Sequence, residues 1–440
     1  MTAAWAAIAI VTVLAVWTVA ALPPLHPAQL WMLPWAVATY LYGLRLLPYR
    51  PLGTTTALLI VAASLAFVVF TRIGERIGER FRFPGFRSRR LGRATALPLA
   101  AAMAVLLAAV LLAAFLLDST AGYGLTDTLL TSAEVRRAIA RGEFSLTIKY
   151  VYLAYAATAL SALAAARASG RRAQMWTVLA ALSAGSIYFS TGRSTTVLAA
   201  TVGIVAYVLG RGVTLSRRKF ILGSAGVAAF TLVVLMVGGF LVGKTFANNR
   251  YLQDVPSIFR DYDAVSDLAL PYAYASAPIA ALDVHVDNTS LLGSTHGCAI
   301  FAEECDVLHK IGVAPQGHER IRPFTREPLP WNTYTALDLP LLDGGFIFAI
   351  PIVGLVGLLV GALWTRARDG SVLAISWYAL LVPALLAAFT QFNFTAPYVV
   401  GAIVIVAVFL AVAHALTHRR PSTARTQPRV GAIVRRDHAA

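Results

Sequence analysis

Charged side chains are scarce in this chain of 440 residues. Asp, Glu, Lys and Arg make up only 13% of the sequence, whereas hydrophobic residues make up 58%. That leaves too little polar surface to cover a soluble globule of this size. The apolar residues also occur in uncharged runs of about 17 to 24 residues, each long enough to cross roughly 30 Å of hydrocarbon. The composition therefore indicates a membrane protein.

Signatures of common soluble enzymes are also missing. The sequence has no G-x-G-x-x-G dinucleotide fingerprint and no G-x-S-x-G nucleophile elbow. It shows no internal repeat, which a transporter or flippase built from repeated halves would carry. These absences remove support for the usual soluble enzyme classes and count against a transporter.

Eleven apolar segments are predicted to be transmembrane helices. No Lys or Arg precedes the first segment and more spans follow it, so we interpret it as a retained helix rather than a cleaved signal. The predicted fold class is all-α, a polytopic membrane protein. The segments are residues 3–22, 28–44, 54–71, 95–117, 147–166, 175–191, 195–210, 220–243, 341–364, 372–391 and 397–416.

The basic residues predict the orientation of these helices. The connection 72–93 carries eight arginines, and cytoplasmic loops are enriched in Lys and Arg. With that connection inside, the N-terminus lies outside and the C-terminus inside. The cytoplasm then holds 23 of the 37 basic residues but four of the 21 acidic ones. The net charge of +16 therefore reflects topology, and we expect no nucleic-acid partner.

This topology divides the chain into four regions. They are the first eight helices with the basic cytoplasmic loop 72–93 and the outer loop 118–146 (1–243), a large extracytoplasmic loop (244–340), the last three helices (341–416), and a disordered basic cytoplasmic tail (417–440). The large loop contains about half of the acidic residues, four of the eight His and both Cys. We expect the chemistry of the protein to lie there.

Two cysteines lie in this large loop. Cys298 and Cys305 are separated by six residues on the oxidising side of the membrane, which favours a disulfide over free thiols or a metal site. Zinc would require further Cys or His at ligand spacing, and the histidines of the loop do not show it. Those histidines are His285, His296, His309 and His318. We therefore predict no metal site.

Arg193 stands between two apolar spans, in the sequence STGRS, with almost no loop around it. An Arg at membrane depth costs roughly 2.5 to 3.5 kcal/mol on insertion scales, so such residues usually face a cavity or an anion. Arg193 is therefore a candidate anion clamp. The alternative is that it extends its side chain to the outer interface.

A polar cluster, WNTYTALDLPLLDGGF, immediately precedes the ninth span. Asp343 is surrounded there by Leu and Phe, so it either caps the following helix or serves a buried polar site. Gly344 and Gly345 permit a turn or a close approach of the backbone. The other polar residues of the cluster are Asn332, Tyr334, Thr335 and Asp338.

Further arginines of the large loop offer bidentate contacts to phosphate, although each alone fits an ordinary surface residue equally well. They are Arg250, Arg260, Arg320, Arg322 and Arg326. An anionic substrate on the outer face is therefore consistent with the charge distribution.

Three segments resemble Wzy-type oligosaccharide repeat-unit polymerases, relatives of the O-antigen polymerases. GLRLLPYRPL resembles a short outer turn of that family, STGRS its glycine-arginine-serine turn, and NTYTALDLPLLDGG its Asn-x-Tyr-Thr signature with a downstream Asp and Gly. The likeness covers most of the chain, but only residues 332–345 are fairly specific. Asp338 departs from the basic or neutral residue expected in that signature, and the Cys pair is not a family hallmark.

The resemblance implies a multi-pass glycosyltransferase of the bacterial cytoplasmic membrane with GT-C-like architecture. Such an enzyme joins polyprenyl-pyrophosphate-linked oligosaccharides on the outer face for O-antigen, capsule or exopolysaccharide. Its partners would be a lipid-linked donor and acceptor, membrane lipids, a flippase and a chain-length regulator. Because the activated donor arrives as a lipid, we expect no cofactor and no metal.

The resemblance also suggests roles for individual residues. Arg193 is the first choice to bind the pyrophosphate leaving group. The proton of the acceptor hydroxyl would pass to a carboxylate or imidazole, and the candidates are Asp338, Asp343, His285 and His318. The signature residues Asn332, Tyr334 and Thr335 would orient sugar hydroxyls or hydrogen-bond a re-entrant backbone. A ligase that transfers the finished glycan, a flippase and a non-catalytic scaffold remain alternatives.

Overall fold

A computed structural model describes most of the chain. It covers residues 2–80, 96–130, 147–191, 193–212, 253–262, 266–288, 292–314 and 333–418, with a few isolated positions between 135 and 222. All regular secondary structure in these ranges is helical. The all-α fold class is therefore confirmed for the described part. Most of the basic loop 72–93, most of the eighth predicted span and the tail beyond 418 lie outside it.

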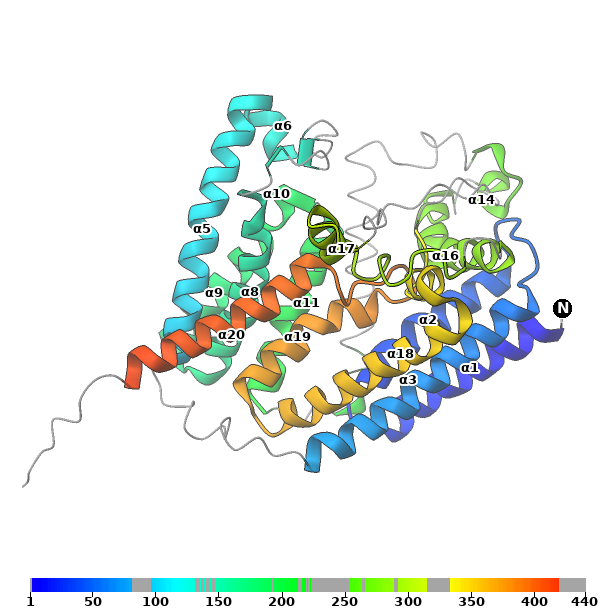
Figure 1. Ribbon diagram of the computed structural model, residues 1–440, viewed down its shortest axis with the longest axis horizontal. Coiled ribbons are helices and arrows are strands. Elements are labelled where there is room, and N and C mark those ends of the chain that lie inside the picture. The colour runs from blue at the N-terminus through cyan, green and yellow to red at the C-terminus, as the bar shows by residue number, and fades with distance from the viewer. Residues whose placement is uncertain are drawn as a thin grey trace, which may run out of the picture.

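The described helices form a bundle with short elements at one end (Figure 1). Long helices run through its body, whereas the short helices α6 and α14 lie toward the top in this view. The elements are α1 (Thr2–Ala21), α2 (Pro27–Leu44), α3 (Thr54–Arg80), α5 (Ala96–Tyr123), α6 (Leu125–Leu130), η2 (Thr147–Lys149), α8 (Tyr150–Arg167), α9 (Gly170–Ser186), α10 (Tyr188–Thr191), α11 (Arg193–Gly210), α14 (Ile258–Asp261), α16 (Ala269–Asp287), α17 (Ala302–Lys310), α18 (Asp338–Arg368), α19 (Val372–Leu386) and α20 (Pro397–His418).

Six of the described helices are long and apolar enough to cross a membrane. Two shorter apolar helices, Thr195–Gly210 and Val372–Leu386, accompany them. The six are Ala4–Ala21, Thr54–Arg80, Ala96–Tyr123, Thr147–Arg167, Asp338–Arg368 and Pro397–Thr417. A multi-pass membrane protein is thus supported, but the described residues do not reach the predicted count of eleven. Predicted spans 28–44 and 175–191 correspond to helices with polar residues in their first turns, which lowers their hydropathy.

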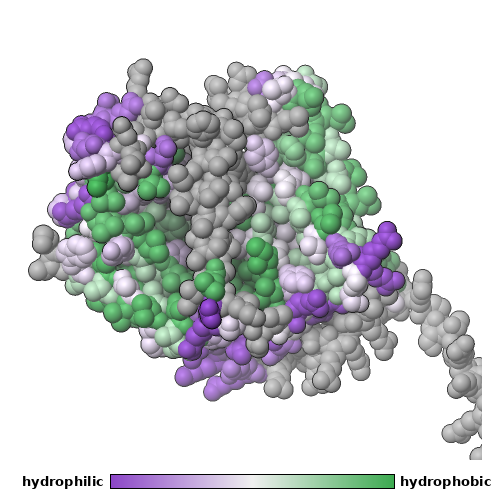
Figure 2. Space-filling view, turned by 180° about the vertical axis from the view of Figure 1, so that it is seen from behind, coloured by the Kyte–Doolittle hydropathy of each residue, from purple (hydrophilic) through white to green (hydrophobic). Residues whose placement is uncertain are grey.

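The outside of the bundle is apolar, as a bilayer requires. Large side chains such as Val13, Leu106 and Leu117 are about two-thirds exposed. Figure 2 shows hydrophobic residues over the flanks of the molecule, with hydrophilic residues gathered at its upper and lower edges. Exposed apolar surface on this scale would be unfavourable in water and is solvated by lipid.

Helices α3 and α18 pack through glycines that let their backbones touch, as in small-residue interfaces of membrane helices. A Cβ added at Gly74 of α3 would lie 2.0 Å from the carbonyl oxygen of Leu358. A Cβ added at Gly361 of α18 would lie 2.2 Å from that of Thr71. Neither oxygen can move without displacing its helix, so only glycine fits at these positions.

Substitution of Gly361 by alanine is therefore expected to destabilise the folded protein by about 1 to 3 kcal/mol, the usual cost of overpacking. The matched control is Gly185→Ala in α9, where no atom lies within 4 Å of an added Cβ. That change should leave stability unchanged or raise it by less than about 1 kcal/mol. Unfolding of both variants in detergent, followed by circular dichroism, checks the difference. Equal effects at the two sites would contradict the close-packed interface.

Candidate active site

Helix α16 is attached to the connection between α2 and α3, which carries the first of the resembling segments. The Tyr272 hydroxyl donates to the carbonyl of Leu41 (2.7 Å) and accepts from the N–H of Leu46 (3.0 Å). The Ser276 hydroxyl donates to the Tyr272 carbonyl (2.7 Å), so its oxygen is left to accept from the Tyr49 hydroxyl at 2.8 Å. Burial raises the pKa of Tyr49, which keeps that proton in place.

Arg50 binds two carboxylates of α16. Its Nε lies 2.8 Å from Oδ2 of Asp283 and its Nη1 lies 2.9 Å from Oδ2 of Asp287. The two acids are four residues apart and therefore share one face of the helix. The Asp283 side chain is 1% exposed, whereas that of Asp287 is 58% exposed. The N–H of Gly53 donates to the other oxygen of Asp283 (3.0 Å). Asp283 thus fastens α16 to the start of α3.

His285 and Asp338 form a buried contact between α16 and the start of α18. His285 Nδ1 contacts Oδ1 of Asp338, and the two side chains are 1% and 2% exposed. The ring of Tyr334 meets the imidazole edge-on, with centroids 6.3 Å apart. Sequence reasoning proposed these three residues separately, and the fold brings them together.

Hydrogen bonds within residues 332–345, the third segment of the resemblance, stabilise the turn before Asp338. Thr335 Oγ1 accepts from the N–H of Leu337 (3.2 Å), and the N–H of Asp338 donates to the Thr335 carbonyl (3.1 Å). The N–H of Ala336 donates to the carbonyl of Ala388, just after α19 (2.7 Å). Thr335 is buried and bonds backbone, the second of the two roles that the sequence suggested for it.

The His285–Asp338 pair has the arrangement of a general base and its orienting carboxylate. A carboxylate at Nδ1 fixes the ring and stabilises the imidazolium that forms when Nε2 takes a proton. Nε2 of His285 is buried, and it has no hydrogen-bond partner among the described residues. Buried polar atoms are nearly always paired, so this nitrogen is a candidate acceptor for a hydrogen bond from a bound group.

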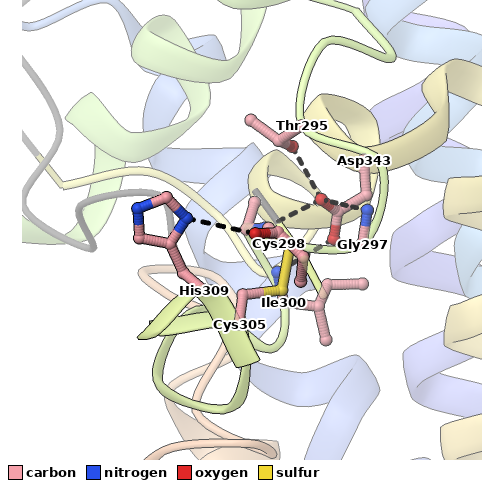
Figure 3. The surroundings of a disulfide bond; sticks show 9 residues. Thr295, Gly297, Cys298, Ile300, Cys305, His309 and Asp343 are labelled. Atoms are coloured by element: carbon pink, nitrogen blue, oxygen red, sulfur yellow. Dashed lines mark hydrogen bonds between the residues drawn. A yellow bond between two sulfur atoms is a disulfide. The ribbon is translucent and has the colours of Figure 1, made fainter. Parts of the chain in front are cut away.

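Asp343 follows Asp338 in α18 but contacts a different segment, residues 292–301 before α17, which we call the 292–301 loop (Figure 3). Its Oδ1 accepts from the Thr295 hydroxyl (2.6 Å) and from the N–H groups of Gly297 (2.9 Å) and Ala299 (2.8 Å). Its Oδ2 accepts from the N–H of Ile300 (2.8 Å). Of the two predicted fates for Asp343, the structure places it in a buried polar site and not at a helix cap.

Cys298 and Cys305 are joined by a disulfide, with their Cα atoms 5.6 Å apart. The disulfide connects the 292–301 loop, which binds Asp343, to α17. Both cysteines are buried. The Thr395 hydroxyl donates to the carbonyl of Ile300 (2.6 Å), which ties the loop to the connection between α19 and α20. The loop is therefore anchored on three sides.

The remaining predicted residues are not brought into this cluster. Arg193 begins α11, and the position of its side chain lies outside the described part of the chain. Arg260 of α14 is 46% exposed and lies 3.4 Å from its neighbour Asp261. The residues that lie outside the described ranges are Arg250, His318, Arg320, Arg322, Arg326 and Asn332. Within those ranges, no group of three or more His, Cys, Asp or Glu could hold a metal ion.

Sequence reasoning missed Arg50, Asp283 and Asp287. A signal existed, because Arg50 lies within the quoted segment GLRLLPYRPL. The acids appear in DVHVD, two charges four residues apart in an apolar helix, which is costly unless a cation pairs with them. Their pairing joins positions more than 230 residues apart, which no local pattern reveals.

A phosphate-binding sequence pattern also occurs at the end of the eighth predicted span. GGFLVGKT, residues 238–245, matches the spacing G-x-x-x-x-G-K-T. That loop requires a strand before it, whereas this one ends an apolar run predicted to be a helix. The segment lies outside the described residues, and we assign it no nucleotide site.

Known proteins offer no template for this arrangement. Comparison of the chain with protein-family models, with curated proteins and with solved structures found no match. A functional assignment therefore depends on the chemistry of the buried His285–Asp338 pair and its neighbours.

Proposed function

We propose that the chain is a membrane glycosyltransferase that polymerises polyprenyl-pyrophosphate-linked oligosaccharide repeat units on the outer face of the bacterial cytoplasmic membrane. The observation that carries this proposal is the meeting of two resembling segments, 43–52 and the described part of 332–345, through α16. Their junction contains an imidazole held by a buried carboxylate. Proton abstraction from an acceptor hydroxyl requires such a group.

Contacts between distant segments support the predicted orientation of the helices. The connection 45–53 and α16, both assigned to the outer face, bind each other through Arg50 and Tyr49. At the cytoplasmic side, Arg167 Nη2 donates to the carbonyl of Gly370 (2.8 Å), and both residues belong to connections assigned to the inside. These contacts fit the predicted orientation, in which the proposed site faces the outer side, where lipid-linked oligosaccharides are joined.

The proposed reaction moves a growing glycan from its lipid onto a new repeat unit. The acceptor hydroxyl gives its proton to Nε2 of His285, and its oxygen forms the new bond to the anomeric carbon of the donor. The bond from that carbon to the pyrophosphate breaks, and the leaving polyprenyl pyrophosphate keeps the electron pair. Asp338 stabilises the imidazolium, and Arg193 is proposed to neutralise the leaving group.

Replacement of Arg193 by alanine is expected to lower chain extension by about 10²- to 10³-fold, the usual cost of losing one electrostatic contact to developing charge. Membrane insertion and protein level should stay normal. The control is Lys310→Ala, which removes an exposed cation of α17. Gel analysis of lipid-linked glycan in membranes from the variants measures the effect. Extension at the wild-type rate in Arg193→Ala would remove the arginine from the mechanism.

Product analysis separates the polymerase from its alternatives. The purified protein is reconstituted in vesicles with lipid-linked repeat units, and the products are resolved by length and by the lipid that they carry. We expect a ladder of glycans on polyprenyl pyrophosphate. Transfer of the glycan to a different acceptor would indicate a ligase, and movement between leaflets without a new bond would indicate a flippase.

A further inference from the structure

The first turns of α18 form a short unit separate from its membrane-spanning part. Gly344 and Gly345 have non-helical backbone angles, and Gly345 has a φ of +63°, which interrupts the helix after Asp343. Glycine adopts this conformation readily, whereas other residues are strained there. Residues 338–343 therefore form a short helical segment with Asp338 at one end and Asp343 at the other. The break at Gly344 and Gly345 means that the rest of α18 does not fix the position of this segment.

Other contacts hold this unit instead. At its start, Asp338 meets His285. Toward its end, the N–H of Gly293 donates to the carbonyl of Leu341 (3.0 Å), and the N–H of Thr295 donates to that of Leu342 (3.2 Å). The four hydrogen bonds to Asp343 follow directly, from the same loop. The 292–301 loop, which the Cys298–Cys305 disulfide joins to α17, is thus the clamp that fixes the position of residues 338–343.

We propose that Asp343 is a positioning residue of the transferase reaction and that it acts through the 292–301 loop, which the Cys298–Cys305 disulfide joins to α17. This inference rests on the proposed function. The carboxylate gathers the loop amides, the loop holds residues 338–343, and Asp338 is thereby kept against His285. Oδ1 of Asp343 accepts three hydrogen bonds and Oδ2 accepts one, all from residues 295–300, so the contacts of the carboxylate in the structure organise the chain itself.

The test is a cycle of variants assayed for chain extension. The first variant is Asp343→Asn, in which an NH2 group that donates hydrogen bonds replaces one of the accepting oxygens and faces a backbone N–H group. The second is Cys298→Ser with Cys305→Ser, and the third combines all three changes. Loss of a hydrogen bond to a charged group corresponds to a rate decrease of about 10- to 100-fold. We expect the kcat of Asp343→Asn to fall by this factor, with KM unchanged. Because both arms loosen one clamp, the combined variant should be no slower than the slower of the two.

Two further measurements separate positioning from direct catalysis and from misfolding. The pH–rate profile of Asp343→Asn should keep the limbs of the wild type, because the residue carries no proton of the reaction. Hydrogen exchange at the amides of Gly297, Ala299 and Ile300 should become faster in Asp343→Asn. The control Glu304→Gln, at an exposed carboxylate of α17, should alter neither property.

Three outcomes would overturn the positioning role. They are a wild-type kcat in Asp343→Asn despite faster exchange, multiplicative losses in the combined variant, and a pH limb that disappears with Asp343. Failure of the proposed function is distinguishable, because the wild-type protein itself would then extend no glycan. The exchange experiment would still show whether Asp343 organises the loop.

Discussion

Chain extension by a His285→Asn variant is expected to be about 10²- to 10⁴-fold slower than in the wild type, the usual contribution of a general base. Asparagine can still donate a hydrogen bond to Asp338 from the position of Nδ1, so the buried carboxylate keeps a partner and the fold is retained. What the variant lacks is a nitrogen that accepts the proton of the acceptor hydroxyl. Asp338→Asn should lower the rate over the same range, because the ring then loses its orientation and the stabilisation of its charged form.

The rate is measured with purified protein and lipid-linked repeat units, alongside thermal unfolding of each variant. The matched control is His309→Ala, at an exposed histidine of α17 whose Nδ1 lies 3.1 Å from the Ala314 carbonyl oxygen. It should extend glycan at the wild-type rate. If His285→Asn were folded and equally active, the proton acceptor would have to be sought elsewhere.

The second large effect is expected at Arg50, where alanine should destabilise the protein by about 3 to 5 kcal/mol. The Arg50 side chain is 28% exposed, but Asp283 is buried, so removing the guanidinium leaves a buried charge uncompensated, which is costlier than losing an exposed pair. Asp283 would keep the Gly53 N–H but lose the guanidinium, in a position that is 1% exposed. Because Asp283 attaches α16 to the start of α3, the loss should also displace His285 from Asp338.

The same arginine provides its own internal control. Asp287→Asn breaks the other ion pair of Arg50, at a carboxylate that is 58% exposed. Exposed pairs contribute about 0 to 1 kcal/mol, so this variant should unfold almost as the wild type does. Combining Arg50→Ala with Asp283→Asn should recover part of the lost stability, since no buried charge remains. Equal destabilisation by Arg50→Ala and Asp287→Asn would show that the burial of Asp283 has no energetic consequence.

Hydropathy predicted the positions of several helices, but it predicted their ends less well. The predicted span 54–71 becomes α3, Thr54–Arg80, because TRIGERIGER continues the helix beyond the apolar run. Arg72 and Glu75 pair across one helical turn there (2.6 Å), which favours helix in a polar sequence. An apolar run reports what lipid can cover. It does not report how far a polar sequence continues the same helix.

The interior of the large outer loop was less accessible to prediction. It was predicted as a large extracytoplasmic loop rich in acidic residues, yet residues 269–287 form a largely buried helix. The polar residues of α16 are those that bond to the connection 45–53 and to Asp338, and their partners lie far away in the chain. Asp343 shows the same limit, since four donors within residues 295–300 decide its environment. Composition indicated which residues could carry chemistry, and only the fold shows which of them meet.

Deleting the gene from its host and measuring the length of the surface polysaccharide tests the central claim most directly. If the chain is the polymerase, the polymer should collapse to a single repeat unit, and a plasmid copy of the wild type should restore long chains. A copy with His285→Asn should not. Polymer of unchanged length in the deletion strain would contradict the assignment.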